Sequence, residues 1–193
     1  MTPAECVLRS RALNVPVVET ERLLLRGWLD EDLDPLAEMY ADPEVMRFIG
    51  DGVVVDRAET ADHIARMTAH WDAHGFGLWA AVDRASGELI GRIGLMMRED
   101  FDNEVEVGWV LARSRWGRGY AAEGGAAALR HGFTALGFAR IISIAHADNS
   151  ASHNVMRKLG MTFGGTRPSS FRPELQTVWY ELSVEAWSTR LRA

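Results

Sequence analysis

The residues that most directly indicate chemistry are Gly117-Arg118-Gly119, past the middle of this 193-residue sequence. They follow an apolar run with strand character, residues 105–111, and precede an alanine-rich, helix-forming stretch from Ala121 to about Leu136. The first amides of a helix have no partners inside the helix and lie at the positive end of its dipole. Glycines let the backbone approach a ligand without an intervening Cβ. A strand, a glycine turn and a helix start therefore predict a cradle for a pyrophosphate.

Two other interpretations of this segment stay open. Residues 117–122 match the dinucleotide fingerprint G-x-G-x-x-G/A, and Asp148 follows the next expected strand, so an NAD(P)-binding oxidoreductase is a remote alternative. That fingerprint normally opens the first βαβ unit, and too few βα units follow here to build a doubly wound sheet. The glycines could also form a purely structural turn before a core helix. A P-loop is excluded here, because no Gly-Lys-Ser/Thr follows.

The segment resembles the pyrophosphate loop of the GNAT superfamily of acyl-CoA-dependent N-acyltransferases, whose pattern is Q/R-x-x-G-x-G/A. Trp116 stands in the first position, and Gly119 and Ala121 stand in the two small-residue positions. Tryptophan departs from the general pattern but is similar to the RimJ/RimL branch, which acetylates N-termini of ribosomal proteins. Three further stretches resemble that branch in the same order, namely residues 20–26, 106–111 and 149–161. The resemblance covers roughly residues 17–186.

This resemblance implies a single α/β domain with a mixed, mostly antiparallel sheet that is splayed around acetyl-CoA and flanked by helices on both faces. We expect an N-terminal arm at residues 1–16, the N-acetyltransferase domain at 17–186 and a tail at 187–193. Because dimers are common in the family, a homodimer is also an expectation.

The resemblance assigns cofactor contacts to three segments. The exposed backbone of the splayed central strand would pair with the pantetheine arm as an added strand does, at Trp109, Val110 and Leu111. The loop that would hold the pyrophosphate comprises Trp116, Gly117, Arg118, Gly119, Tyr120, Ala121 and Ala122. Asn149 matches the family asparagine that contacts the pantetheine. Simple burial would also explain the strand, and Asn149 could instead cap a helix.

Acyl transfer from a thioester to an amine needs an amine without its extra proton, a polarised carbonyl and a proton for the thiolate. Glu106 lies two residues before Gly108, where many superfamily members carry a catalytic glutamate, so the resemblance implies a general base. A structural ion pair is the alternative role. Strand alternation places Glu104 on the same face, which makes it the second candidate.

The proton donor is less well defined by the sequence. Met156 stands where many relatives carry a tyrosine, and it cannot donate a proton. The ribosomal-protein branch has a serine that matches Ser152, which could protonate the thiolate or only hydrogen-bond to the cofactor. Tyr120, Tyr180 and water also stay open, and we expect His146 and His153 to be structural or solvated. The missing tyrosine keeps a non-catalytic acyl-CoA-binding module as the main alternative.

Composition narrows the class of protein. Hydrophobic residues make up 47% and charged residues 25%, as in ordinary globular domains. The net charge of −6 argues against a nucleic-acid partner and is compatible with a cationic amine acceptor, either a peptide N-terminus or a small amine. A single cysteine, no apolar run long enough to span a membrane and no secretory signal indicate a cytoplasmic protein. No metal is expected, because no His/Cys/Asp cluster has ligand spacing.

Periodicity predicts the elements that must position these residues. Strands are expected near residues 17–28, 76–82, 88–97, 105–111, 140–147, 161–167 and 177–185. Helices are expected near residues 33–40, 43–49, 57–74, 120–136 and 149–159. The helix at 120–136 should face the sheet with Ala122, Ala126, Leu129, Phe133 and Leu136. In the resembled family the early helices shape the acceptor pocket, which implicates Met39, Tyr40, Met46, Phe48 and Trp71.

Overall fold

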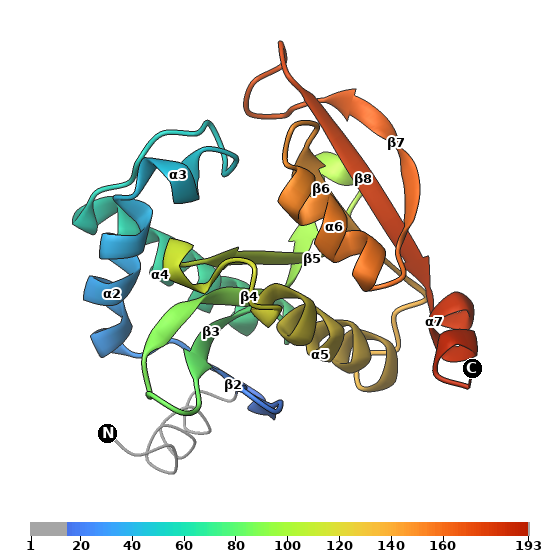
Figure 1. Ribbon diagram of the computed structural model, residues 1–193, viewed down its shortest axis with the longest axis horizontal. Helices are drawn as coiled ribbons and strands as arrows, with labels where there is room; N and C mark the ends of the chain where they lie inside the picture. The colour runs from blue at the N-terminus through green and yellow to red at the C-terminus, as the bar shows by residue number, and fades with distance from the viewer. Residues whose placement is uncertain (1–14, 193) are drawn as a thin grey trace.

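An eight-stranded mixed sheet organises the computed structural model, which describes residues 15–192 (Figure 1). The strands are β1 (Val18–Glu19), β2 (Leu23–Arg26), β3 (Leu78–Asp83), β4 (Leu89–Arg98), β5 (Glu104–Leu111), β6 (Arg140–His146), β7 (Thr162–Pro168) and β8 (Gln176–Ser183). Their order in the sheet is β1-β2-β3-β4-β5-β6-β8-β7. Between residues 15 and 192, β5 and β6 are the one parallel pair. The predicted fold is confirmed, and the doubly wound sheet that a dinucleotide site requires is absent from this part of the chain.

Helices cover both faces of the sheet. They are α2 (Leu33–Tyr40), α3 (Pro43–Met46), α4 (Arg57–His74), α5 (Tyr120–Thr134), α6 (Ser150–Lys158) and α7 (Val184–Arg190), with short 3-10 turns η1 (Asp30–Asp32), η2 (Glu99–Phe101) and η3 (Arg113–Arg115). Helix α5 packs on β4 and β5 on one face, while α2 packs against α4 and β4 on the other. Neither these nor any other helix within residues 15–192 has the length and apolar character needed to cross a membrane.

The inner face of α5 differs from the predicted one. Ala126 is exposed and Leu136 lies beyond the helix, whereas Gly124, Gly125 and Gly132 are buried. A Cβ on Gly124 would lie 2.4 Å from Ile93 Cδ1, and one on Gly132 would lie 2.6 Å from Ile141 Cδ1. The helix therefore lies closer to the sheet than any side chain would allow. Leu129 and Phe133 are buried, as predicted. The glycines of this face were missed because an apolar periodicity does not count them.

The two halves of the sheet meet at one point. Strands β5 and β6 are paired only at Glu106 and Ile142, whereas β4 pairs with β5 along eight residue pairs and β6 pairs with β8 along seven. Beyond Glu106 the two parallel strands diverge. The β6-facing edge of residues 108–111 therefore has no strand partner, as the prediction of a splayed sheet requires.

The N-terminal part of the domain departs from its predicted elements. Residues 17–28 form two short strands separated by a bend, and Asp30 opens a 3-10 turn before α2. Asp32 instead forms a buried fork with Arg26, with N–O distances of 2.6 and 2.7 Å. The pair fastens the start of α2 to β2. At the other end, α7 crosses the predicted boundary at 186/187, and the Trp187 ring packs 5.2 Å from the ring of Phe133.

His70 joins α4 to the sheet in a way that depends on its neutral form. Its Nδ1 donates to the Phe76 carbonyl at 2.8 Å, and its Nε2 accepts from the Met97 N–H at 3.0 Å. Burial lowers the pKa of His70 below its usual range, and burial also lowers the pKa of His131. A depressed pKa in the folded state stabilises the fold above the ordinary histidine pKa of about 6.5. That stabilisation is lost as the pH falls through the folded-state value.

We therefore expect the free energy of unfolding to fall as the pH is lowered from 7 to 5. Urea denaturation at each pH measures this slope, and H70Q should flatten it, because glutamine does not titrate. A slope as steep in H70Q as in the wild-type protein would remove His70 as a source of the pH dependence.

Candidate functional site

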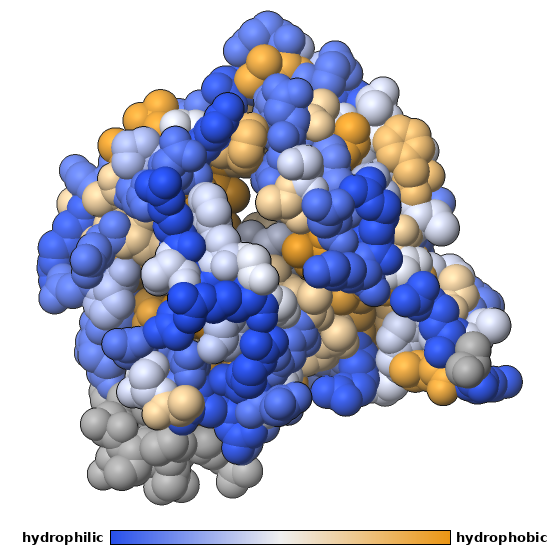
Figure 2. Space-filling model, in the orientation of Figure 1, coloured by the Kyte–Doolittle hydropathy of each residue, from blue (hydrophilic) through white to orange (hydrophobic). Residues whose placement is uncertain are grey.

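A cavity of about 900 Å³ lies where β5 and β6 diverge, and Figure 2 shows a recess near the centre of this face. Its floor includes Glu106, Gly108, Trp109 and Val110 from β5 and residues 143–146 of β6. Residues of α2, α3, α4 and the loop between α3 and α4 form one wall. The start of α6 and the loop between β7 and β8 form the other. The cavity thus lies between the early helices, where an acceptor pocket was predicted, and the start of α6, which carries Asn149 and Ser152.

Glu106 is a buried carboxylate at the base of this cavity, with 5% of the residue exposed. Its Oε2 accepts from Arg98 Nη1 at 2.6 Å, and its Oε1 accepts from the Ile144 N–H at 3.3 Å. Arg98 also forms a two-bond fork with Asp100, at 2.8 and 2.9 Å. Burial opposes the charge of Arg98, but these hydrogen bonds outweigh it and raise the pKa of the guanidinium. The hydrogen bond from Arg98 in turn holds the pKa of Asp100 below its usual range.

Glu104, the second candidate, lies outside the cavity lining and forms its own ion pair with Arg140. The two glutamates therefore have separate arginine partners, and they do not form a coupled carboxylate pair. Glu106 also forms the ion pair that was considered as its alternative role, with Arg98. The same carboxylate therefore forms a salt bridge and lines the cavity. No local pattern identified Arg98 as the partner of Glu106, because the hydrogen bond joins neighbouring strands.

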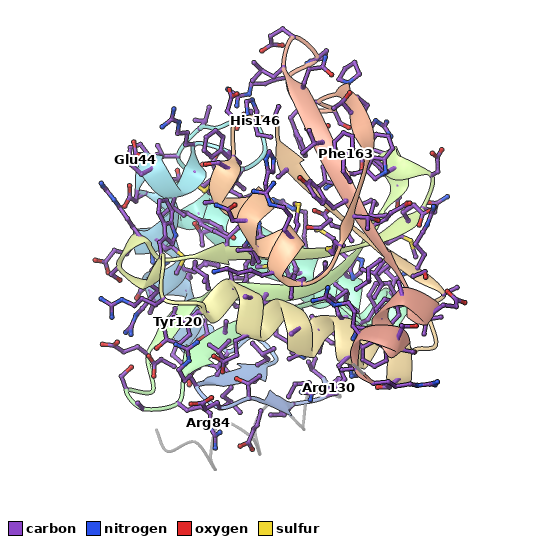
Figure 3. All side chains as sticks on the ribbon, turned by 45° about the vertical axis from the view of Figure 1, so that its right-hand side comes forward. Glu44, Arg84, Tyr120, Arg130, His146 and Phe163 are labelled. Carbon is purple, nitrogen blue, oxygen red and sulfur yellow. The ribbon has the colours of Figure 1, made fainter. Side chains whose placement is uncertain are left out.

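The start of α6 brings Asn149 and Ser152 to the same cavity. Asn149 Oδ1 accepts from the Ser152 N–H at 3.1 Å and so caps the helix, which was the alternative role for this residue. Met156 is completely buried and contributes to the core. His146, expected to be structural or solvated, also lines the cavity, with its ring stacked 5.3 Å from that of Phe48. Figure 3 shows His146 at the end of β6 that lies near α3, the helix that carries Glu44.

The glycine loop has the geometry of an anion cradle. Gly117 and Gly119 have φ angles of 71° and 86°, in the left-handed region that favours glycine. The first helical hydrogen bond of α5 runs from the Glu123 N–H to the Gly119 carbonyl, at 3.0 Å. Among the described residues, no acceptor is found for the N–H groups of residues 117–122. These donors lie at the positive end of the α5 dipole.

Side chains distant in the sequence hold this loop in place. Arg22 donates to the Arg118 carbonyl at 2.9 Å, forms an ion pair with Glu123 at 2.6 Å and lies over the Tyr120 ring at 4.5 Å. The Tyr120 hydroxyl donates to Asp83 Oδ2 at 2.8 Å. Figure 3 shows Tyr120 at the start of α5. Sequence reasoning missed these partners, because Arg22 and Glu123 are 101 residues apart.

Trp116 has a role that the sequence did not predict. Its Nε1 donates to the Leu111 carbonyl at 2.8 Å, while 46% of the residue is exposed. The Leu111 carbonyl is therefore already engaged within the chain. Neither Leu111 nor the loop at 116–122 lines the cavity. The predicted site thus consists of a cavity and a separate cradle, joined by the open edge of β5.

The predicted acceptor residues divide in two. Tyr40, Met46 and Phe48 line the cavity. Met39 and Trp71 do not, and the Trp71 ring packs in the core, 5.1 Å from the ring of Trp79. Of the polar patch at 98–104, Arg98 and Phe101 reach the cavity, whereas its acidic side chains do not. The charged residues Arg66, Arg92, Arg167 and Arg172 also line the cavity and were not singled out by the sequence.

Comparison with known proteins agrees with this geometry. The sequence profile of the acetyltransferase (GNAT) domain family matches residues 22–162. Among curated relatives, "Uncharacterized N-acetyltransferase YoaA" of Bacillus subtilis is 29% identical, over 75% of this chain and 82% of that protein. "FsC-acetyl coenzyme A-N(2)-transacetylase" of Aspergillus fumigatus is 31% identical, over 76% of this chain and 65% of that protein.

Solved structures share the fold. An acetyltransferase from Agrobacterium tumefaciens is 30% identical, with a TM-score of 0.75, over 87% of this chain and 94% of that one. RimL, described as a ribosomal L7/L12 alpha-N-protein acetyltransferase in complex with coenzyme A, is 17% identical, with a TM-score of 0.75, over 89% of this chain and 99% of that one. The chain therefore belongs to the GNAT family of acetyltransferases, whose members use acetyl-CoA and act on an amine acceptor.

Proposed function

We propose that this protein transfers the acetyl group of acetyl-CoA to a primary amine bound in the 900 Å³ cavity, by direct attack within a ternary complex. The observation that carries the proposal is the position of Glu106, a buried carboxylate where the parallel strand pair opens. A proton acceptor is thereby placed between an acceptor cavity and an open strand edge. The names of the Aspergillus relative and of RimL, which refer to acetyl-CoA and coenzyme A, support the choice of co-substrate.

The residues of the cradle fit the phosphates of acetyl-CoA. Six successive N–H groups, at residues 117–122, have no acceptor among the described residues, and a Cβ on Gly117 would meet no atom within 4 Å. The open edge of β5 offers the Trp109 backbone and the Leu111 N–H to the pantetheine arm, whereas the Val110 backbone faces β4. Asn149 and Ser152 line the cavity from the start of α6. Bound acetyl-CoA would supply the activated acetyl group and leave as the free thiol.

Side chains of the protein would accept and donate the protons of the reaction. Glu106 takes a proton from the bound ammonium, directly or through water, so that the amine nitrogen gains its lone pair. The new N–C bond then forms as the C–S bond breaks. Backbone N–H groups near Val110 would stabilise the developing oxyanion. The ammonium loses two protons in the reaction. One passes through Glu106 to solvent. The thiolate receives one proton from the Ser152 hydroxyl, and the second proton of the amine replaces it.

The acceptor is either a peptide N-terminus or a small amine. RimL acts on a protein N-terminus, and the name of the Aspergillus relative specifies an N(2) position. Isotopically labelled acetyl-CoA, offered with N-terminal peptides, amino acids, polyamines and aminoglycosides, would reveal the product by mass spectrometry. Label on any amine supports the transferase. Binding of acetyl-CoA without label on any amine would instead support the non-catalytic module. A homodimer and RimJ/RimL-type specificity are proposed from the resemblance, and a cytoplasmic location is proposed from the composition of the sequence.

Substitution of Gly117 tests the cradle. G117A should weaken CoA binding about fivefold, because alanine disfavours the left-handed conformation by about 1 kcal/mol and shifts the loop. G87A is the matched control, since Gly87 also has a positive φ of 75°, meets no atom within 4 Å and lies in the β3–β4 turn. Calorimetric titration with CoA should show an unchanged affinity for G87A. Equal affinities of G117A and the wild-type protein would argue against the cradle.

A further inference from the structure

We propose that the amine acceptor also carries a carboxylate, and that the Arg92 guanidinium binds this carboxylate. The proposal rests on the proposed function and names the class of its acceptor, an amino acid-like amine. It begins from an imbalance among the charges that line the cavity. Five arginines line it, namely Arg66, Arg92, Arg98, Arg167 and Arg172, and within residues 15–192 only Arg98 has a carboxylate within ion-pair distance.

Of the other four, Arg92 and Arg167 lie on strands, and Arg92 is the one on a central strand, because β7 is an edge strand of the sheet. It is half-buried on β4, opposite Val110 of β5. Its Nε donates to the Tyr40 hydroxyl at 2.6 Å, and the Tyr40 residue is only 1% exposed, so a buried phenol fixes the guanidinium. No acceptor for Nη1 or Nη2 is found among the described residues. A planar guanidinium held at Nε with free Nη donors has the geometry for two parallel bonds to a carboxylate.

The floor of the cavity sets the distance between the two charged ends. Glu106 and Val110 lie on the same face of β5, four residues apart, which corresponds to about 13 Å between their Cα atoms. Gly108 lies between them, and the nearest atom to a Cβ built on it would be Glu106 Oε1, at 3.9 Å. No side chain therefore separates the two ends of this floor. Because the Arg92 and Glu106 side chains each shorten the gap, the space suits a compact molecule with an amine at one end and an anion at the other.

The charges around Arg92 support an anionic partner. Three carboxylates of this wall line the cavity, and all are exposed: Asp51 in the loop between α3 and α4, and Glu59 and Asp62 on α4. Glu59 also caps its own helix. His63 lies against Tyr40, with 5.7 Å between the ring centroids. Burial first, and then the charges of Arg66 and Arg92, lower the pKa of His63. Arg92 is therefore the half-buried cation of this wall, while Arg66 and the acidic groups are exposed at its rim.

The test compares three forms of one acceptor. Each trio consists of an amino acid, its carboxamide and the corresponding amine without the carboxyl group, built on small, acidic and aromatic side chains. Rates of CoA release would give kcat/KM for every member with the wild-type protein, R92Q and R92K. R130Q is the control, because Arg130 is exposed on the outer face of α5, away from the cavity (Figure 3). The ratio of kcat/KM between members of a trio does not depend on the fraction of folded enzyme.

We expect the wild-type protein and R130Q to favour the carboxylate over the carboxamide by about 10- to 100-fold in at least one trio, because a charge-assisted bond is lost in the amide. R92Q should reduce that ratio to near one, and R92K should give an intermediate ratio. A wild-type protein that acetylates all three members equally, or prefers polyamines, would overturn this inference and leave the proposed function in place. A ratio unchanged in R92Q would also overturn it. Absence of acetylation of every amine would count against the proposed function itself.

Discussion

Glu106→Gln is expected to lower kcat about 100-fold, within the range for loss of a general base, while the affinity for CoA changes less than about threefold. Glutamine keeps an oxygen for the Ile144 N–H but cannot accept a proton from the ammonium. Steady-state kinetics with the identified acceptor and calorimetric titration with CoA would measure the two quantities. The effect should be on kcat, because the carboxylate acts on the bound amine and does not bind the cofactor phosphates.

Glu104→Gln is the matched control for this substitution. Glu104 is on the same strand and is also paired with an arginine, but it lies outside the cavity, so its loss should change kcat less than twofold. If Glu106→Gln retains the wild-type kcat, the carboxylate serves only its ion pair with Arg98, and another group or water must act as the base. A drop in kcat that accompanies an equal drop in CoA affinity would indicate a displaced β5 rather than a missing base.

Arg26→Leu is expected to reduce the free energy of unfolding by about 3 to 5 kcal/mol, because it leaves the Asp32 carboxylate buried without its cation. Arg26 and Asp32 are 3% and 2% exposed and form two hydrogen bonds to each other. Urea denaturation at pH 7 would measure the loss. The consequence reaches the cavity, because the pair fastens the start of α2, whose last residue is Tyr40.

The double variant R26L/D32L distinguishes two causes of the stability loss: a buried carboxylate left without its cation, and packing lost with the arginine side chain. Replacing both members of a buried ion pair by apolar residues is often neutral, so the double variant should recover most of the stability that Arg26→Leu loses. Arg57→Leu provides the comparison with an exposed pair, since Arg57 and Asp34 are largely accessible, and it should cost less than about 1 kcal/mol. A double variant no more stable than the single one would show that packing, rather than charge, sets the cost.

Local patterns predicted much of the fold, because helix periodicity, cap residues and turn residues depend on residues that are close together in the sequence. The periodicity at 57–74 gave α4 with both ends correct, and the glycine loop, Asn149 and Ser152 all lie at helix starts, as the cap and turn residues indicated. Glu106 was placed on its strand by alternation and by resemblance. The proposed chemistry of these residues stays a prediction until the variants are measured.

The partners of these residues could not be predicted, because they come from other elements. Arg98 contacts Glu106 from the neighbouring strand β4. Arg22 contacts the glycine loop from a position 96 residues earlier in the sequence. In the sequence, Arg92 is a polar residue within a predicted strand, and no pattern distinguishes it. The fold shows that its side chain lines the cavity beside the buried Tyr40 hydroxyl. The prediction for the inner face of α5 found Leu129 and Phe133 but missed Gly124 and Gly132, because glycines are not counted as apolar residues.

The single residue pair that joins β5 to β6 also has a thermodynamic consequence. Backbone hydrogen bonding hardly links the two halves of the sheet, although β5 and β6 remain in contact and α5 contacts strands on both sides of the opening. A ligand that pairs with the open edge of β5 and also contacts α6 adds a further connection between the halves. By mass action, such a ligand at a hundredfold excess over its Kd adds about 2.7 kcal/mol to the stability of the folded chain. The co-substrate would then be a structural component of the sheet as well as a reactant.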